Sequence, residues 1–91
     1  MSDPTIWDEF RGQEVVLDVV SQYVIIGTLE RVDTHFATLT DADCHDLRDS
    51  KTTRDLYVLQ VRRHGVRANR ERLSVRQNEI VSLSRLADVI E

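Results

Sequence analysis

Residues 12–41 read GQEVVLDVVSQYVIIGTLERVDTHFATLTD, and this stretch decides the fold. Two runs rich in β-forming residues meet at Ser21–Gln22, a joint short enough for a tight hairpin. Within each run, alternate apolar residues share one face, because successive strand side chains point to opposite sides. These candidates for the buried face are Val15, Leu17, Val19, Ile25 and Leu29. The stretch therefore predicts two antiparallel strands with one buried face.

The second run contains Gly27 at a position that would otherwise carry an inward-facing side chain. A glycine in mid-strand weakens the strand unless the backbone bends sharply or another segment comes close. Such a kink in a strand of about ten residues is what a small closed barrel needs to curve its sheet. Asp33–Thr34 then predicts a turn, because the Asp33 carboxylate can accept hydrogen bonds from its own turn. The third run, residues 35–41, completes a three-stranded meander.

This spacing resembles the first motif of the Sm and Sm-like (LSm) family, in which apolar-x-Gly-x-Leu precedes Asp-x-x-Met-Asn. Ile25-x-Gly27-x-Leu29 matches the core of that motif. Residues 33–37 match the remainder, with Phe in place of Met and Ala in place of Asn. Residues 73–81 resemble the second motif, Ile-Arg-Gly followed by two apolar residues, with Gln77 in place of Gly. The chain thus resembles a divergent, bacterial-type member of the family.

The resemblance implies a mainly β fold, a small five-stranded and strongly bent Sm-like (SH3-like) barrel formed by residues 1–91 as a single domain. We expect strand four at residues 72–77 and strand five at residues 79–83, joined tightly at Asn78–Glu79. A helix at about residues 4–11 precedes the first motif. A loop and an inserted helix, about residues 42–66, separate strands three and four. Residues 84–91 form a short helical or irregular tail that packs on the barrel.

The resemblance also implies an RNA site. At the family's corresponding positions, His35 would stack on a base, Arg76 would pack on the other side of that base, and Asp33 would order the loop beneath. Ala37 stands where the family has the Asn that reads the uracil edge, and alanine has no side-chain donor or acceptor. The expected RNA-binding positions are therefore 33, 35, 37 and 76, with base specificity weakened at Ala37. A structural role for His35 remains the alternative.

Both helices carry their own boundary residues. Asp3–Pro4 predicts the start of the first helix, which Gly12 ends, and Trp7 is expected to pack on the barrel rather than stack on a ligand. Ser50 or Thr52 is the expected N-cap of the second helix, which ends near Gly65. A strand at residues 56–61 is the competing interpretation, and Val66 to Arg72 is expected to be a basic, solvated connector.

Composition and charge restrict the possible functions. The net charge of −4 is divided unevenly, with about −8 on residues 1–50 and about +4 on residues 51–91. The basic half could serve a partner, or one subunit's basic half could meet another's acidic half. No run of eighteen apolar residues suggests a membrane span, and no signal segment opens the chain. The lone Cys44 fits a reducing compartment, so we expect a cytoplasmic protein.

Few residues suggest catalysis or metal binding. Asp41, Asp43 and His45 would share a face if extended, which makes a divalent ion conceivable, but a solvated acidic strand end is the preferred interpretation. Cys44 has no evident base or orienting group, so it is not a candidate nucleophile. No triad, catalytic carboxylate pair or phosphate loop is visible. We therefore expect no enzyme, no cofactor and no metal.

Two functions remain. In the first, the chain forms a ring, a homo-hexamer or homo-heptamer, that binds single-stranded RNA at its central pore. Unpaired edge strands invite pairing with another chain, and a head-to-tail contact closes into a ring if the rotation allows. In the second, the ring is a protein-interaction scaffold that has lost the RNA site. His35, Arg76 and the basic run from Arg62 to Arg76 favour the first. Ala37, the net charge and the extra helix favour the second.

Overall fold

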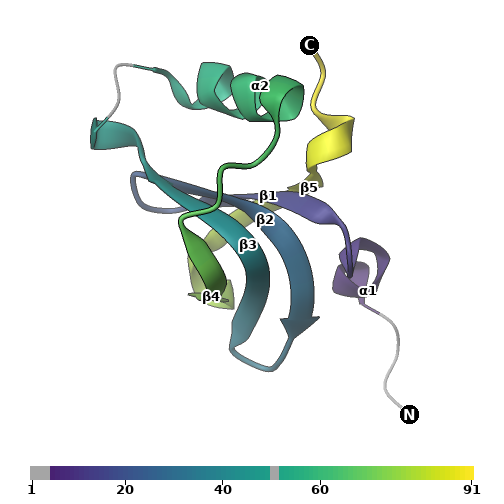
Figure 1. The fold of residues 1–91 in the computed structure, drawn as a ribbon. Coiled ribbons are helices and arrows are strands. Elements are labelled where there is room, and N and C mark those ends of the chain that lie inside the picture. The colour runs from purple at the N-terminus through teal and green to yellow at the C-terminus, as the bar shows by residue number, and fades with distance from the viewer. Residues whose placement is uncertain (1–4, 50–51) are drawn as a thin grey trace.

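The computed structural model describes residues 5–49 and 52–91. Five strands form one antiparallel sheet in the order β4-β3-β2-β1-β5 (Figure 1). The strands are β1 (Glu14–Val19), β2 (Tyr23–Val32), β3 (Phe36–Asp46), β4 (Arg70–Arg76) and β5 (Ile80–Arg85). The helices are α1 (Ile6–Phe10) and α2 (Arg54–His64), with 3₁₀ turns at Leu47–Asp49, Gln77–Glu79 and Leu86–Asp88. The predicted five-stranded Sm-like architecture is confirmed, but β4 and β5 do not pair with each other, so the bent sheet remains open.

Gly27 lies where the longest strands bend. A Cβ atom added to it would stand 2.9 Å from both Cα and Cβ of Ala42, which is closer than real Cβ contacts come. On the facing strand, Asp41 has a φ of 48°, and the pairing shifts register between Ile26 and Thr28. A β-bulge of this kind bends its strand and increases the local twist. The predicted role of Gly27, a close backbone approach at the bend, is thus confirmed.

The sheet buries apolar side chains on both faces. The inner face carries the alternating positions predicted from the sequence, all at most 6% exposed: Val15, Leu17, Val19, Ile25 and Leu29. The outer face forms a second core beneath α2, where Tyr57 and Val61 pack with Val16, Val24 and Ile26. Each buried side chain of this size contributes about 1.5–3 kcal/mol. The second core fixes the inserted helix to the sheet.

α1 closes one end of the inner core. The Asp8 carboxylate accepts a hydrogen bond from the Thr5 backbone N–H at 2.7 Å, which holds the first turn. Phe10 is buried, and Trp7 packs against the same core, so the packing role predicted for Trp7 is confirmed. Gly12 follows the helix with a φ of 81°. The start predicted at Asp3–Pro4 lies outside the described residues.

α2 is a helix between β3 and β4, as predicted, and the competing strand interpretation is wrong. Its N-cap is Thr53, whose Oγ1 accepts a hydrogen bond from the Leu56 N–H at 3.2 Å. The predicted N-cap Thr52 is therefore wrong by one residue, and the alternative, Ser50, lies outside the described residues. Gly65 ends the helix with a φ of 92°, and its N–H donates to the Val61 carbonyl at 2.8 Å. Tyr57 and Val61 are one turn apart and share the buried face, which is why helix outcompetes strand here.

Three strands extend beyond their predicted limits. β3 continues to Asp46, because α2 covers its outer face and supplies partners for its polar side chains. β4 begins at Arg70, within the segment expected to be a solvated connector, and β5 ends at Arg85. The tail packs as predicted, since Leu86 is buried in the second core and Val89 lies against it.

Candidate nucleic-acid interface

The β2–β3 turn is held by the side chain of Asp33. Its Oδ1 atom accepts hydrogen bonds from the backbone N–H groups of His35 and Phe36, each at 2.8 Å. The Asp33 N–H in turn donates to the Phe36 carbonyl at 2.9 Å. These backbone donors favour the ionised carboxylate and hold its pKa below the usual 3.8. The turn therefore presents the intervening residues, including His35, in a defined orientation.

The β4–β5 turn contacts the β2–β3 turn directly. The Gln77 N–H donates to the His35 carbonyl at 2.8 Å, and the Gln77 side-chain amide donates to the Asp33 carbonyl. Gln77 stands where the resembling motif has glycine, and the sequence did not reveal this bridging role. The only hint was an amide side chain in place of glycine at that position. Both candidate motifs therefore meet through paired backbone and side-chain contacts.

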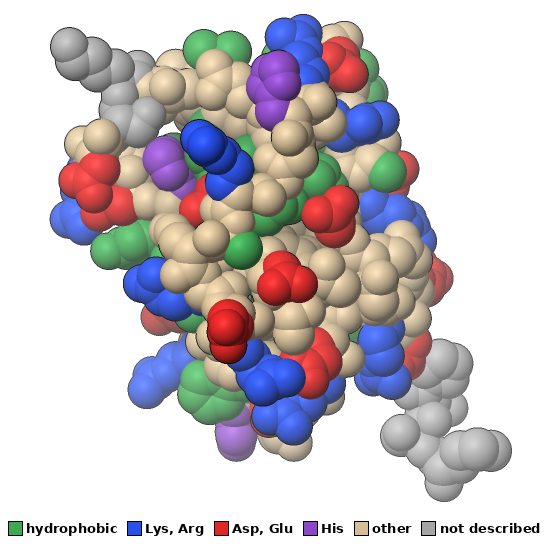
Figure 2. All heavy atoms as spheres, in the orientation of Figure 1, with side chains coloured by type: hydrophobic (Ala, Val, Ile, Leu, Met, Phe, Trp, Pro, Cys, Tyr) green, Lys and Arg blue, Asp and Glu red, His purple; other side chains and the backbone are tan. Residues whose placement is uncertain are grey.

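A hollow of 370 Å³ lies between these turns, lined by Thr34, His35, Phe36, Arg76, Gln77 and Asn78. His35 and Arg76 are both exposed and border it from opposite turns. Figure 2 shows arginine, acidic and histidine side chains intermixed at the end of the molecule where β4 and the β2–β3 turn lie. An imidazole and a guanidinium beside one hollow can stack on a planar base and contact a phosphate.

Three of the four predicted site positions come together, and one does not. Asp33, His35 and Arg76 belong to the two turns around the hollow. Ala37 is fully buried in the inner core, paired with Val75 of β4, and does not line the hollow. Phe36, which stands at the family's Met position, lines the hollow and is 37% exposed. Sequence reasoning overlooked this aromatic ring, although its position next to His35 was the available indication.

Side chains at the end of β3 contact α2 and the segment before β4. The Tyr57 hydroxyl and the Asn69 side-chain amide donate to Asp43, which is 8% exposed. His45 stacks on the Tyr57 ring with centroids 3.9 Å apart. Asp41 occupies the bulge, so the three side chains do not converge, and residues 5–49 and 52–91 hold no group of three potential metal ligands. Asp43 and His45 instead attach α2 to the sheet.

Cys44 is half-buried, and burial raises the pKa of its thiol. A thiol that resists ionisation is a poor nucleophile, which agrees with the sequence-based interpretation of Cys44. Within the described residues, none of the helices has the length and apolar character needed to cross a membrane.

The fold has a counterpart among solved structures. No protein-family model matches the chain, and no curated protein sequence matches it. It is similar to the Sm protein of Pyrococcus abyssii, whose structure was solved in complex with a uridine heptamer. The two chains are 15% identical and superpose with a TM-score of 0.59, over 90% of this chain and 99% of the other. The chain therefore has the Sm fold.

Proposed function

We propose that this protein binds single-stranded RNA in the hollow between its β2–β3 and β4–β5 turns. The observation that carries the proposal is the meeting of His35 and Arg76, from two distant sequence motifs, at one exposed hollow. The Sm protein with the similar fold was solved with a uridine heptamer, which supports a nucleic-acid ligand for this fold. The role is one of binding and not of catalysis.

Each side chain has a distinct part in this proposal. The His35 imidazole stacks on a base, and Phe36 offers a second aromatic surface beside it. Arg76 contributes positive charge and five donors to a base edge or phosphate. Asp33 contacts no RNA; it holds the turn through its hydrogen bonds to His35 and Phe36.

Base selectivity is expected to be low. Ala37 has no polar side-chain atom and is fully buried, so it supplies no group that reads a base edge. Stacking tolerates every base, because each has a π-face. We therefore infer recognition of an unpaired strand with little preference for uridine.

We further propose that the binding form is a closed ring of six or seven copies. β4 and β5 are the two edges of the sheet, and each presents unpaired backbone groups. A gap of 290 Å³ beside β4 is lined by apolar residues that include Ile25, Leu73 and Val75. Pairing β4 of one copy with β5 of the next satisfies these edges and would gather the hollows around a pore. Cys44 as a free thiol suits a reducing compartment, so we place this ring in the cytoplasm.

Filter binding with a single-stranded oligonucleotide tests the RNA site. His35→Ala should weaken binding about tenfold, since base stacking contributes about 1–3 kcal/mol. Arg76→Ala should weaken it comparably and reduce its salt dependence, because a cationic contact is lost. Arg62→Ala, which removes an exposed arginine on α2 away from the hollow, is the matched control. Binding that both site variants leave unchanged would move the RNA to another surface and refute this site.

The second candidate is a ring that acts as a protein scaffold without RNA. The burial of Ala37 and the net charge of −4 favour it. It predicts that the parent protein assembles but shows no measurable binding to single-stranded RNA at low salt, where phosphate contacts are strongest. The same filter-binding series therefore separates the two candidates.

A further inference from the structure

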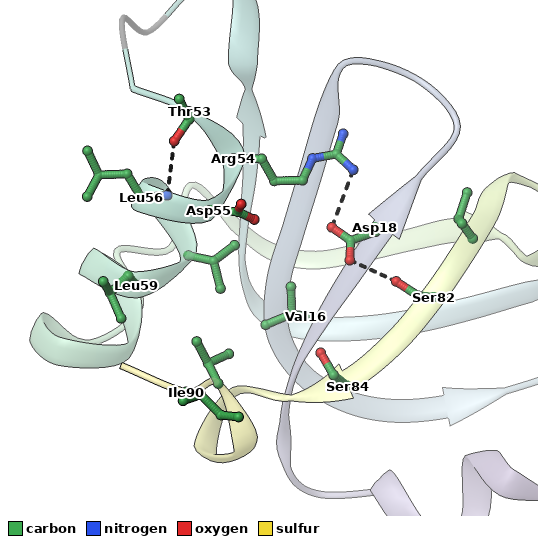
Figure 3. Close-up of a pocket in the computed structure, with 13 residues that line it drawn as sticks. Val16, Asp18, Thr53, Arg54, Asp55, Leu56, Leu59, Ser82, Ser84 and Ile90 are labelled. Atoms are coloured by element: carbon green, nitrogen blue, oxygen red, sulfur yellow. Dashed lines mark hydrogen bonds and ion pairs between the residues drawn. The ribbon is translucent and has the colours of Figure 1, made fainter.

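A groove lies between α2 and β5, away from the RNA-site hollow. It measures 770 Å³, and Figure 3 shows its walls and floor. Leu56 and Leu59 project from α2, while Val16 of β1 and Ser82 and Ser84 of β5 lie on the sheet side. The RNA proposal uses none of these residues.

The groove exposes apolar surface. Leu56 is 47% exposed, Val81 of β5 is 67% exposed, and Ile90 of the tail is 93% exposed. All three line the groove. Scattered exposed apolar side chains are common, but a set gathered around one groove is typical of an interaction surface. Burying these side chains against a partner would contribute about 25 cal/mol of favourable free energy per Å² of apolar surface removed from water.

One border of this groove is a free sheet edge. β5 pairs with β1 on one side only, because it is the last strand in the sheet order. α2 packs on the outer face of the sheet, next to that edge. A strand added to β5 would therefore have its outer face turned toward the exposed side of α2.

The other free edge, β4, has an outer face of suitable chemistry. Leu73 and Val75 point to the inner core, so alternation puts Arg72 and Ser74 on the outer face. On the groove side, Asp55 is exposed on α2 and takes part in none of the ion pairs found among the described residues. Asp55 on the groove wall and Arg72 on β4 carry opposite charges. Within one copy Arg72 forms an ion pair with Glu30 at 2.9 Å, so Asp55 of a neighbouring copy would be a second acidic partner for it.

We propose that the groove between α2 and β5 receives the β4 edge of a second copy of this chain, so that α2 forms a second layer of the subunit contact. The inference rests on the ring proposed above and adds the helix to it. The contact then consists of a joined sheet, an apolar cover from Leu56, and an attraction between Asp55 and the arginines of β4. The inserted helix is thereby an assembly element and not only a cover for the outer core.

Sedimentation velocity over a range of protein concentrations tests this contact. Leu56→Lys should raise the concentration at which the ring dissociates about tenfold, equivalent to about 1.4 kcal/mol. Asp55→Lys should raise it as well, by repelling β4. Gln60→Lys is the matched control, because it adds the same charge to the same helix but does not line the groove. Circular dichroism should show that all three variants remain folded, since the three replaced side chains are exposed.

The outcomes separate the groove from the ring itself. Suppose that the parent forms a ring and that Leu56→Lys and Asp55→Lys weaken it no more than the control Gln60→Lys does. The ring proposal then stands, but the groove does not receive β4, and the inference is overturned. If the parent is monomeric at every concentration, the ring proposal and this inference both fail. Selective loss of assembly in the two groove variants supports the second copy as occupant.

Discussion

Gly27 shows how one missing side chain sets the curvature of the sheet. Its Cα faces Ala42 across a bulge, and any Cβ would come within 2.9 Å of two atoms of that residue. One of those atoms is backbone, so the neighbour cannot swing aside as a flexible side chain could. The close approach lets β2 and β3 stay paired through the bend that brings their turn beside the β4–β5 turn.

Gly27→Val should therefore destabilise the protein by about 1–3 kcal/mol or more, because extra methyl groups in a well-packed core force strain on their neighbours. Thermal or urea unfolding monitored by circular dichroism measures the loss. Thr28→Val, on the neighbouring half-buried position, is the control and should change stability much less. A Gly27→Val protein that melts with the parent would contradict the close approach at this position.

Asp33 makes a pH-dependent contribution to the order of its turn. Because its folded pKa lies below 3.8, the ionised carboxylate favours the folded state above that value, and this contribution disappears as pH falls through the folded pKa. Asp33→Asn should lower the melting temperature at neutral pH, and the difference from the parent should shrink in acid. Glu14→Gln, which neutralises an exposed acid at the start of β1, is the control. A difference that grows in acid would reverse the assigned sign.

Individual residues also show which features of the structure could not be predicted from the sequence. Alternation and the mid-strand glycine correctly predicted the inner core and the bend, because both follow from strand geometry alone. The burial of Ala37 and the bridge from Gln77 to Asp33 depend on residues more than thirty positions away. Local pattern carries no information about such contacts, so the hollow could be predicted only in part.

At the scale of elements, α2 is joined to the sheet by a small polar network as well as by its apolar face. The Tyr57 hydroxyl donates to Asp43, and the Tyr57 ring stacks on His45. Desolvation raises the pKa of the Asp43 carboxyl, with His45 acting in the opposite direction, so this buried acid depends on its donors. Removing one donor should be more costly than removing an exposed hydroxyl.

Tyr57→Phe should destabilise the protein by about 1–3 kcal/mol at neutral pH, because Asp43 loses a buried hydrogen-bond donor. Tyr23→Phe, which removes a hydroxyl that accepts a long 3.5 Å hydrogen bond from the exposed Arg48, should cost less than about 0.5 kcal/mol. The lost donor matters most when the Asp43 carboxylate is ionised. Because the pKa of Asp43 is raised, the folded protein protonates this carboxyl at a higher pH than an ordinary Asp. The cost of Tyr57→Phe should therefore fall as the pH is lowered toward 3.8. Urea unfolding measures both losses in the free energy of unfolding. Equal losses for Tyr57→Phe and Tyr23→Phe would show that the hydrogen bond from Tyr57 to Asp43 does not stabilise the protein.

Element types were easier to predict than element limits. Helical spacing and Gly65 indicated α2, and two apolar-rich runs indicated β1 and β2. The extension of β3 to Asp46 was not predictable, since an acidic segment has low strand propensity and is kept extended by its contacts with α2 and Asn69. Tertiary contacts overrode the local preference there.

At the scale of the whole molecule, the open sheet leaves β4 and β5 as its two edges. The register of β4 on β3 determines which backbone N–H groups of β4 point to the free edge. Gln77 and His35 are hydrogen-bonded, and bonded pairs alternate along an antiparallel ladder. Val75 is therefore the next residue bonded to β3, and the N–H of Ser74 points to the free edge. An edge-breaking proline belongs at position 74, because at 75 it would disrupt the sheet within one copy.

Ser74→Pro should dissociate the proposed ring, because it removes a backbone donor at the free edge of β4. Ser74→Ala is a close control, since both variants lose the 2.8 Å contact between Ser74 and Thr38 but only the proline loses the N–H. Size-exclusion chromatography with light scattering should show smaller species for Ser74→Pro alone. Equal assembly of both variants would place the subunit contact elsewhere.

The most direct test is native mass spectrometry of the parent protein, with and without a short uridine-rich RNA strand. We expect a single closed oligomer of six or seven copies that gains the mass of one strand per ring. His35→Ala should retain the oligomer and lose the strand. A monomer at micromolar concentration would refute the proposed ring. An oligomer that never gains RNA would favour the scaffold function over RNA binding.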